Sequence, residues 1–538
     1  MATKVSSKYD HITCKVLIQP GSPNVYRLKP KKENIGTLTR MTLGEKDPSK
    51  LKKTILLVGA TGAGKSTLIN ALVNYTMGVK WKDDVWFQIV EDEEKSQSES
   101  QTTDVIVYEI FGFEGQTLPY SLTIIDTPGY GDTRGTDHDD IISERLLDLF
   151  RSNDGVHEID AVGLVMKASV NRLDDRLRYI FDSVVSLFGK NMEKNIVALI
   201  THSNGRTPKN VLKAIETAEI RCAKDEKNHQ PVHFLFDNCQ HEDRTEETEA
   251  LQQADKTTMK GLSQFTNFLE KTESQKLKET VNVLNERKRL AACMNNLQER
   301  IEFIEKKQSA IQQNQEALKK YEQEVKNNKE FTAEVEEVYK VKEPVSEWRW
   351  WAFGLNYGGA VCCTVCKENC HYPCTLAWYP EHCEVMKGKY CTVCTGKCPV
   401  SAHVKETWKY ESKTRTVQMT KQDMKEKYEK GKAGCEKSTS LLETLQQNIE
   451  ELEKEKDQWL EEAFQHVESL EHLALKVNSL STLVHLDFLI EKMKEKGDTE
   501  KVTRLEKMKG QMDENEGIKG AVSYRFGRLT AAVKAAVK

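Results

Sequence analysis

Residues 59 to 67 read Gly-Ala-Thr-Gly-Ala-Gly-Lys-Ser-Thr and directly follow the apolar run Thr54-Ile-Leu-Leu-Val58. This is G-x-x-x-x-G-K-[ST] between a predicted strand and a predicted helix, the context of a phosphate-binding P loop. The glycines allow successive backbone N–H groups to surround phosphate oxygens, and the positive end of the helix faces the same anion. We predict that Lys65 reaches the β- and γ-phosphates and that the Ser66 hydroxyl binds Mg²⁺. The predicted phosphate contacts are Gly59, Ala60, Thr61, Gly62, Ala63, Gly64, Lys65, Ser66 and Thr67.

A second apolar strand ends in an aspartate, in the stretch Ser121-Leu-Thr-Ile-Ile-Asp126-Thr-Pro-Gly129. In P-loop enzymes this aspartate holds Mg²⁺, usually through water, and the glycine lets a backbone N–H approach the γ-phosphate. The polar stretch from Ser96 to Asp104 lies between the two signals and offers Thr102, or its neighbour Thr103, as a hydroxyl that closes over Mg²⁺ in the triphosphate state. The predicted Mg²⁺ ligands are therefore Ser66, Thr102 and Asp126.

A third strand leads into Thr201-His202-Ser203-Asn204, where P-loop GTPases read the base. At this point the chain resembles the septin-like branch of GTPases and, within it, the immunity-associated nucleotide-binding proteins. The stretch Asp126-Thr-Pro-Gly129-Tyr-Gly-Asp132-Thr-Arg134 is similar to both groups. The resemblance covers about residues 50 to 240 and implies an α/β G domain that binds GTP or GDP with Mg²⁺. The whole layout resembles a group of uncharacterised fish and fungal proteins, which brings no known activity.

The base-reading stretch departs from the usual Asn-Lys-x-Asp, whose carboxylate accepts from two guanine N–H groups. The amide of Asn204 offers one acceptor and two donors, so it cannot match both, and unpaired buried polar groups cost roughly 1–3 kcal/mol each. His202 can instead stack on the base, as in the similar Thr-His motif of chloroplast-import receptor GTPases. The stretch Phe236-Asp-Asn238-Cys239 resembles the family's last base-contact loop. We predict guanine recognition by Thr201, His202, Asn204 and Asn238, against the alternatives ATP and xanthine nucleotides.

Hydrolysis is expected to be slow, because Tyr130 stands where Ras-like switches place a water-orienting glutamine. In the resembling families two G domains meet across their nucleotides, and an added residue completes the site. Arg134 is the candidate for charge neutralisation, in cis or across a dimer; the more conservative reading is a surface arginine paired with Asp132 or Asp137. The catalytic candidates are Lys65, Thr102 and Arg134. The competing hypothesis is a scaffold that binds nucleotide without hydrolysing it.

Composition limits the remaining possibilities. The chain has 538 residues, enough for about three units, with 30% charged and 38% hydrophobic residues and a formal net charge of −4. A net charge this small does not by itself predict a nucleic-acid or membrane partner. The N-terminus has no apolar signal region, and no stretch of about eighteen apolar residues occurs, so we expect no transmembrane segment and a cytoplasmic protein.

Strand and helix patterns alternate in residues 51–240, which predicts an α/β P-loop domain with a mainly parallel sheet covered by helices on both faces. The expected strands lie near 54–58, 104–110, 121–126, 160–167, 196–201 and 232–236, and the expected helices near 66–74, 140–150, 174–188 and 208–222. The other predicted segments are a lead-in at 1–50 with one strand near 15–19, an acidic linker at 241–256, a coiled-coil helix at 257–340, a Cys/His-rich module at 341–415, coiled-coil helices at 416–512 and a basic tail at 513–538.

Two stretches show heptad spacing and flank the Cys/His-rich module. In the first, apolar residues recur every seven positions, at Val283, Leu290, Leu297, Ile304, Ile311, Leu318 and Val325. In the second, a/d spacing continues from Leu442 to Leu480. The simplest architecture is an antiparallel intramolecular hairpin with the Cys-rich unit at its tip, and the rival is a parallel intermolecular coiled coil. A homodimer through G domains or coiled coil, with further unidentified protein partners, is expected.

Nine of the fourteen cysteines fall between Cys362 and Cys398, and six of these nine form two copies of C-x₂-C-x₃-C. Short C-x₂-C spacing lets two thiolates share one Zn²⁺ on a tight turn. Structural zinc, with two ions, is favoured over disulfides or a redox cluster, since no secretory signal is present. The zinc-ligand candidates are Cys363, Cys366, Cys370, His371, Cys374, Cys383, Cys391, Cys394, Cys398 and His403, with Cys362 a possible spare. His371-x₂-Cys374 fits RING-type spacing, but no C-x₂-C follows at once, so a ubiquitin ligase is not favoured.

Two further features have alternative readings. The aromatic stretch Trp348-Arg-Trp350-Trp351-Ala-Phe353 is interpreted as the small core of the Cys-rich unit rather than a partner or membrane patch. The segment from Gly517 to Lys538 is basic with no acidic residue and could contact an anionic membrane surface, although a fraying tail is the simpler interpretation. A coiled-coil ATPase of the chromosome-organising type would need a Ser-Gly-Gly signature near the C-terminus, which the sequence lacks.

Overall fold

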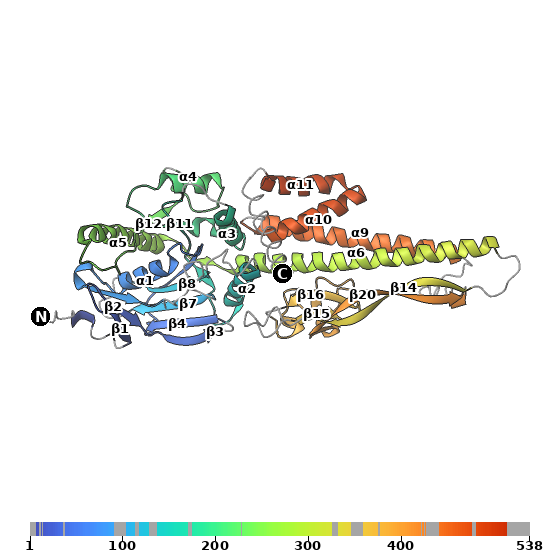
Figure 1. Cartoon of the computed structure of the whole chain (residues 1–538), viewed down its shortest axis with the longest axis horizontal. Coiled ribbons are helices and arrows are strands. Elements are labelled where there is room, and N and C mark those ends of the chain that lie inside the picture. Colours follow the sequence, from blue (N-terminus) through green and yellow to red (C-terminus); the bar gives the residue numbers. More distant parts are fainter. Residues whose placement is uncertain are drawn as a thin grey trace. The chain divides into compact units, whose positions relative to one another are not determined.

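The computed structural model of the chain is drawn in Figure 1. It describes residues 7–9, 12, 14–35, 38–90, 104–112, 118–128, 137–170, 175–227, 229–324, 332–345, 359–374, 377–420, 422–423, 426, 441–475 and 480–513. The chain divides into two compact units: the first comprises Met1–Leu284, Leu473–Leu480 and Met508–Lys538, and the second comprises Asn285–His472 and Ser481–Lys507.

The first unit is built on an eight-stranded sheet with the strand order β12-β11-β10-β5-β8-β7-β4-β3. The central strand β5 runs parallel to its neighbours β10 and β8, whereas the pairs β7–β8 and β3–β4 are antiparallel. The strands are β3 (Lys31–Ile35), β4 (Leu38–Gly44), β5 (Lys52–Gly59), β7 (Ile106–Gly112), β8 (Ser121–Asp126), β10 (Ala161–Lys167), β11 (Ile196–Thr201) and β12 (His233–Leu235). The expected α/β fold is confirmed, with a sheet that is mixed.

Helices cover both faces of this sheet. Ile55 and Leu57 belong to one hydrophobic cluster with residues of α1 and α5, while Leu56 and Val58, which alternate with them, are fully buried outside that cluster. Because side chains alternate along a strand, the second pair faces the opposite layer, where α3 contacts β5. The helices are α1 (Lys65–Thr76), α2 (Asp137–Arg151), α3 (Asp175–Val185), α4 (Lys209–Thr217) and α5 (Thr248–Lys271).

The predicted lead-in is part of the first unit. Strands β3 and β4 extend the main sheet, and β1 (Lys15–Gln19) and β2 (Asn24–Leu28) form a second sheet with β6 (Val85–Gln88). The expected boundary at residue 50 is therefore wrong, because the pairing of these strands with distant segments is not visible in their local sequence. Short 3₁₀ helices complete the list: η1 (Ser7–Tyr9), η2 (Trp81–Asp83), η3 (Lys190–Asn195), η4 (Pro380–His382) and η5 (Val400–Ala402).

The predicted linker and the start of the coiled coil are also corrected. Residues 248–271 form α5, whose buried face includes Leu251, Leu262 and Phe265 and packs on β12 and α1. The helical pattern then stops at β13 (Gln275–Lys276), which pairs with β9 (Glu158–Ile159). Helical periodicity predicted the part of α5 from residue 257 onward, and only its tertiary contacts assign the helix to the first unit.

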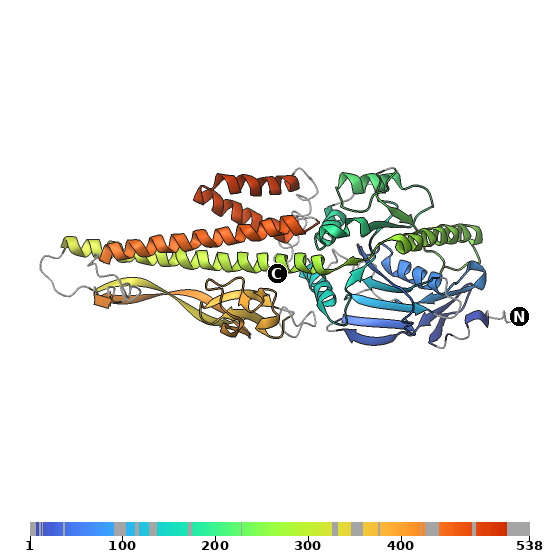
Figure 2. The ribbon, with the colours of Figure 1, turned by 180° about the vertical axis from the view of Figure 1, so that it is seen from behind.

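In the second unit, α6 (Lys278–Glu324) runs antiparallel to α9 (Leu441–Leu473), as Figures 1 and 2 show. Glu286 of α6 lies 3.4 Å from His466 of α9, whereas Ile311, further along α6, clusters with Leu445 near the start of α9. The predicted heptad positions that the structure describes are buried: Val283, Leu290, Leu297, Ile304 and Ile311. The antiparallel pairing within one chain agrees with the hairpin hypothesis.

Two more helices, α10 (Leu480–Lys496) and α11 (Thr499–Asp513), follow α9 within the segment predicted as coiled-coil helices at 416–512. Ion pairs join them: Lys494 of α10 lies 2.6 Å from Glu506 of α11, and Arg504 of α11 lies 3.1 Å from Glu471 of α9.

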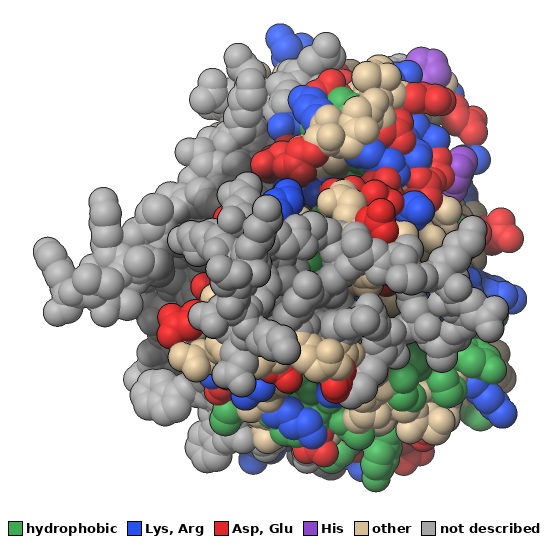
Figure 3. All heavy atoms as spheres, turned by 90° about the vertical axis from the view of Figure 1, so that its right-hand side faces the viewer, with side chains coloured by type: hydrophobic (Ala, Val, Ile, Leu, Met, Phe, Trp, Pro, Cys, Tyr) green, Lys and Arg blue, Asp and Glu red, His purple; other side chains and the backbone are tan. Residues whose placement is uncertain are grey.

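Figure 3 shows acidic and basic side chains interspersed on the upper part of the face that it draws. Among the described residues, no helix combines the length and the apolar character needed to span a membrane.

A long two-stranded ribbon replaces predicted helix on both sides of the Cys-rich unit. Strands β14 (Thr332–Pro344) and β20 (Trp408–Thr420) pair antiparallel over their full length, so the predicted helical segments ending at 340 and starting at 416 are wrong there. Cross-strand partners such as Val335 and Val417 lie about eighty residues apart in the sequence. Their pairing depends on this distant match, which local periodicity cannot reveal.

The Cys-rich unit does not lie at the tip of the helical hairpin. Its strands are β15 (Gly359–Cys363), β16 (Glu368–Cys374), β17 (Met386–Lys387), β18 (Tyr390–Cys391) and β19 (His403–Glu406). The ribbon runs back along α6, so that Asn296 donates a 2.8 Å hydrogen bond to the Asn369 carbonyl and Arg300 lies 2.5 Å from Glu368. The unit therefore packs on the first half of α6.

Candidate nucleotide-binding site and metal centre

The P loop joins the end of β5 at Gly59 to the start of α1 at Lys65. Gly62 and Gly64 have φ values of +75° and +92°, a backbone conformation that favours glycine. A Cβ atom on Gly64 would also lie 3.3 Å from the methyl group of Thr201. The loop thus takes the turn expected of a phosphate cradle, and α1 directs its N-terminus toward it.

The Lys65 side chain folds over its own loop. Its Nζ donates to the carbonyl oxygens of Gly59 at 2.9 Å and Ala60 at 3.4 Å. Burial lowers the pKa of Lys65 from 10.5 to about 8, and the negative charge of Asp126 partly opposes this shift. A buried ammonium group that lies against carbonyl oxygens and near a carboxylate is well suited to receive a polyanion.

Asp126 ends strand β8 in register with Leu57 of β5 and is fully buried. The next residue, Thr127, donates a 2.9 Å hydrogen bond to the Leu57 carbonyl, which holds the end of β8 beside the P loop. Ser66 is half-buried on the first turn of α1. The predicted Mg²⁺ ligands Ser66 and Asp126 thus lie on adjacent elements; Thr102, Gly129, Tyr130 and Arg134 lie outside the described residues.

The base-reading strand is fastened to the P loop. The Thr201 hydroxyl, at the end of β11, donates to the Ala63 carbonyl at 2.7 Å and lies 3.3 Å from the Met166 carbonyl. His202 follows with φ at +50°, and its Nδ1 lies 3.2 Å from the Thr201 hydroxyl. Burial, and then the positive charge of Lys167, lower the pKa of His202. A neutral imidazole at this position is suited to stacking on a base.

The Asn204 amide oxygen accepts a hydrogen bond within the protein, and the Asn238 amide lies beside Thr258. The Asn204 Oδ1 accepts a 3.1 Å hydrogen bond from the backbone N–H of Arg206, and the Asn238 Oδ1 lies 3.4 Å from the Thr258 hydroxyl. An open cavity of about 480 Å³ is lined by His202, Asn204 and the segment from Arg206 to Asn210. In the described part of the chain, the buried Nδ2 of Asn238 has no hydrogen-bond partner.

Thr258 is a residue that the sequence analysis missed. It lies on α5, donates to the Asp237 carbonyl at 2.7 Å and accepts from the Asp237 N–H at 2.9 Å, which fixes the loop that carries Asn238. Its helix was assigned to the coiled coil, so no local signal connected it with the base-contact loop.

The predicted metal ligands come together in three groups of donor atoms. All ten predicted ligands are included, and within each group the donor atoms lie within 4.8 Å of one another. The groups are Cys363, Cys366, Cys394 and Cys398; Cys370, Cys391, Cys394 and His403; and His371, Cys374, Cys383 and Glu384. Sequence spacing missed Glu384, although it directly follows Cys383. Cys362 lies outside the groups and contacts Asn369, in agreement with its reading as a spare.

Close approach in the first group requires a glycine. A Cβ atom on Gly396 would lie 2.9 Å from the Cys398 sulfur and 3.3 Å from the Cys366 sulfur. The Gly396 N–H also donates to the Cys366 sulfur at 3.3 Å.

The thirteen described cysteines form no disulfide with one another. The Trp348–Phe353 stretch and the basic tail lie outside the described residues.

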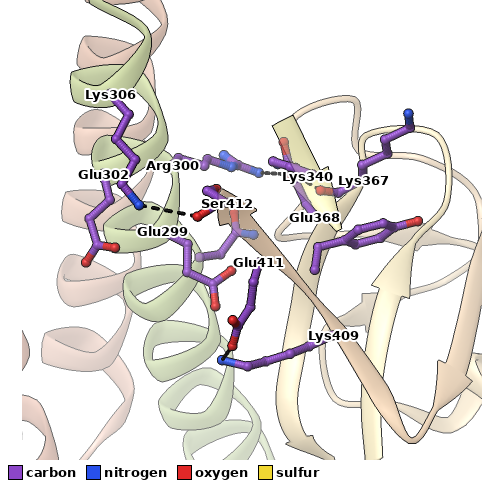
Figure 4. Close-up of a pocket in the computed structure, with 12 residues that line it drawn as sticks. Glu299, Arg300, Glu302, Lys306, Lys340, Lys367, Glu368, Lys409, Glu411 and Ser412 are labelled. Atoms are coloured by element: carbon purple, nitrogen blue, oxygen red, sulfur yellow. Dashed lines mark hydrogen bonds and ion pairs between the residues drawn. The ribbon is translucent and has the colours of Figure 1, made fainter. Parts of the chain in front are cut away.

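A charged cavity of about 260 Å³ lies where the Cys-rich unit meets α6 (Figure 4). Its charged groups are matched within the protein: Arg300 pairs with Glu368 at 2.5 Å, and Lys409 lies 3.4 Å from Glu411. Lys306 reaches across to the Ser412 carbonyl at 3.4 Å. The mixed charges identify this cavity as part of a polar interface between α6 and the Cys-rich unit rather than an anion-binding site.

Residues 50–147 match the family model described as Septin. Comparison with curated proteins gave no match. Among solved structures, the chain is similar to Toc33 from Arabidopsis thaliana in complex with Mg²⁺ and GMPPNP, at 16% identity, covering 42% of this chain and 88% of that chain with a TM-score of 0.30. It is also similar to the chloroplast translocon components atToc33 and psToc159, for whose GTPase activity dimerization is important, at 18% identity, 35% and 71% coverage and a TM-score of 0.25.

A third similar structure is translation elongation factor SelB from Methanococcus maripaludis with the GTP analogue GppNHp, at 13% identity, 42% and 35% coverage and a TM-score of 0.24. The strand–loop–helix geometry and the Septin match together define the class: the first unit is an α/β domain of the P-loop GTPase type.

Proposed function

We propose that this protein is a guanine-nucleotide-dependent switch that binds GTP or GDP with Mg²⁺, hydrolyses GTP slowly, and carries a structural zinc module. One observation carries the proposal: the buried Lys65 ammonium lies against the carbonyls of its own glycine loop, beside Asp126. A triphosphate bound by the glycine loop would place further negative charge against this lysine. Mg²⁺ would bind at Ser66 and Asp126, with Thr102 as the third candidate ligand.

Guanine is the proposed base, with His202 stacking on it and Asn204 and Asn238 contacting its edge. The cavity beside His202 and the buried amide of Asn238 support this assignment. Because the Asn204 oxygen already accepts from Arg206, we expect weaker discrimination between guanine and adenine than a carboxylate would give.

Hydrolysis is proposed to depend on a homodimer formed through G domains, the helical hairpin or both, with Lys65 and Arg134 stabilising charge on the transferring phosphate. The resemblance to septin-like and immunity-associated GTPases supports this step.

Zinc is proposed to stabilise the folded Cys-rich unit. The three groups of mostly buried Cys, His and Glu donor atoms would bind the metal, and metal binding adds the stability that this small hydrophobic core lacks. Free cysteines fit a reducing compartment, and we propose the cytoplasm.

Equilibrium titration with fluorescent guanine and adenine nucleotides, with and without Mg²⁺, tests the binding proposal on the full chain. We expect GTP to bind more tightly with Mg²⁺, Lys65→Ala to weaken triphosphate binding at least tenfold, and the exposed Lys194→Ala to leave it unchanged. Equally poor triphosphate binding by the wild-type chain and by Lys65→Ala would refute the proposal, and tighter binding of ATP would refute the guanine assignment.

Turnover per chain, measured over a range of protein concentrations, tests the proposed dimer. We expect the rate to rise with concentration and Arg134→Ala to flatten that rise. Bound GTP that is not hydrolysed at any concentration would favour the alternative of a nucleotide-binding scaffold.

A further inference from the structure

We propose that the Cys-rich unit binds three zinc ions: a two-metal cluster bridged by the Cys394 thiolate, and a separate ion whose fourth ligand is the Glu384 carboxylate. The inference rests on the structural zinc of the proposed function and goes beyond the two ions expected from spacing. It assigns the ligand pairing, the stoichiometry and an oxygen ligand.

The sulfur positions fit tetrahedral metal sites. Four ligands around Zn²⁺, with Zn–S bonds of about 2.3 Å, hold neighbouring sulfur atoms about 3.8 Å apart. The Cys366 and Cys398 sulfurs lie 3.6 Å apart and those of Cys374 and Cys383 lie 3.9 Å apart. A disulfide would bring them to about 2.05 Å. These pairs are therefore spaced as ligands of a common ion.

Cys394 belongs to two of the three groups. The first and second groups together contain six cysteines and one histidine, whereas two tetrahedral ions need eight ligand positions. A thiolate that bridges both ions supplies the missing position. Cys394 is fully buried, and its sulfur accepts a 3.2 Å hydrogen bond from the Cys398 N–H. Both ions are then closed off by protein ligands, as in structural rather than catalytic sites.

Backbone contacts prepare the other ligands of this cluster. In each C-x₂-C turn the N–H of the second cysteine donates to the sulfur of the first, from Cys366 to Cys363 at 3.3 Å and from Cys394 to Cys391 at 3.4 Å. His403 Nδ1 lies 2.9 Å from the Pro399 carbonyl. Because a carbonyl can only accept, Nδ1 carries the proton and Nε2 is the nitrogen available to the metal.

The third group forms the separate site. His371 Nδ1 lies 3.1 Å from the Cys383 sulfur and 3.5 Å from Glu384 Oε2, and the Glu384 side chain is fully buried. Lys288 of α6 lies 3.8 Å from the other carboxylate oxygen, and Arg289 donates a 2.9 Å hydrogen bond to the Glu384 carbonyl. Two thiolates, a histidine and a carboxylate complete a tetrahedral set, and Glu384 links it to α6.

Native mass spectrometry and elemental analysis of the full chain, purified without chelator, test the stoichiometry. We expect three zinc ions per chain, two after Cys374→Ser, one after Cys394→Ala, and three in the matched control Cys362→Ser. A wild-type content of two would overturn this inference while leaving structural zinc in place, whereas no zinc would overturn the zinc module itself.

A second measurement tests the bridge on the wild-type chain alone. After exchange with ¹¹³Cd²⁺, the wild-type chain is expected to give three NMR resonances, two of them mutually coupled through the bridging sulfur. Three resonances without metal–metal coupling would overturn the bridge, and retention of the third resonance at unchanged chemical shift in Glu384→Gln would overturn the carboxylate ligand.

Discussion

At the scale of single residues, the chemistry of Lys65 depends strongly on its surroundings. It is 8% exposed, and burial without a full counter-charge lowers its pKa to about 8. The unfolded chain therefore binds more protons than the folded chain between about pH 8 and 10.5, so this group makes the empty protein more stable as pH rises through that window.

Nucleotide binding should show the opposite pH dependence. Above pH 8 the protein without nucleotide loses the Lys65 charge. Triphosphate binding must then restore the proton, and we predict a fall in affinity of up to about tenfold per pH unit. Dissociation constants between pH 7 and 9.5 for wild type and Lys65→Ala would measure the difference. Parallel pH profiles for the two chains would contradict the assigned role of Lys65.

At the scale of elements, α1 has two tasks. Its first turn closes the P loop, and two asparagines further along hold the strand segment that precedes the predicted switch. Asn74 donates to the Phe87 carbonyl at 2.7 Å and accepts from the Phe87 N–H at 3.0 Å, while the Asn70 oxygen accepts from Ile89 at 2.9 Å. β6 is an edge strand of its sheet, so the backbone groups on its open edge have no neighbouring strand. The two buried asparagine side chains supply hydrogen-bond partners to that backbone.

Removing one of these asparagines should weaken the whole first unit. In Asn74→Ala the N–H and carbonyl of Phe87 lose their buried partner, and we predict a loss of about 3 kcal/mol in the free energy of unfolding. Urea unfolding measures this loss. The transition that belongs to the first unit is the one whose midpoint shifts when GTP is added. The exposed substitution Lys213→Ala on α4 is the control and should stay within about 0.5 kcal/mol of wild type. An unchanged urea midpoint in Asn74→Ala would show that these contacts do not stabilise the first unit.

At the scale of the molecule, the two units have separate cores and separate chemistry. The predicted phosphate and base contacts that the structure describes all come from the first unit, and all eleven candidate zinc ligands come from the second. The small Cys-rich sheet has few large side chains of its own, and its hydrophobic cluster consists largely of the cysteines. Its folding should therefore depend on metal, whereas that of the first unit should not.

A zinc-selective chelator that leaves Mg²⁺ in solution tests this separation. We predict that chelation abolishes amide protection in β15, β16 and β19, measured by hydrogen exchange, and changes the dissociation constant for GTP by less than about twofold. Restoring zinc should restore protection. A large change in nucleotide affinity on chelation would show that the metal module controls the G domain.

The P-loop turn, the place of Asp126 at the end of a strand, the alternation of strands and helices and the residue types of the candidate metal ligands were all predictable from the sequence. Each is a local pattern: glycines and a lysine between an apolar strand and a helix, or thiols spaced for one turn. Chemistry that is encoded within about ten consecutive residues can be recognised before any fold is known.

Only the tertiary structure decided which distant residues meet. The β14–β20 ribbon, the place of α5 and Thr258 in the first unit, the position of the Cys-rich unit along α6, and the sorting of its ligands into three groups with Glu384 all depend on contacts between separate segments. Such contacts are set by packing and pairing across the whole chain, because a local pattern specifies what a segment can form but not which partner will cover it.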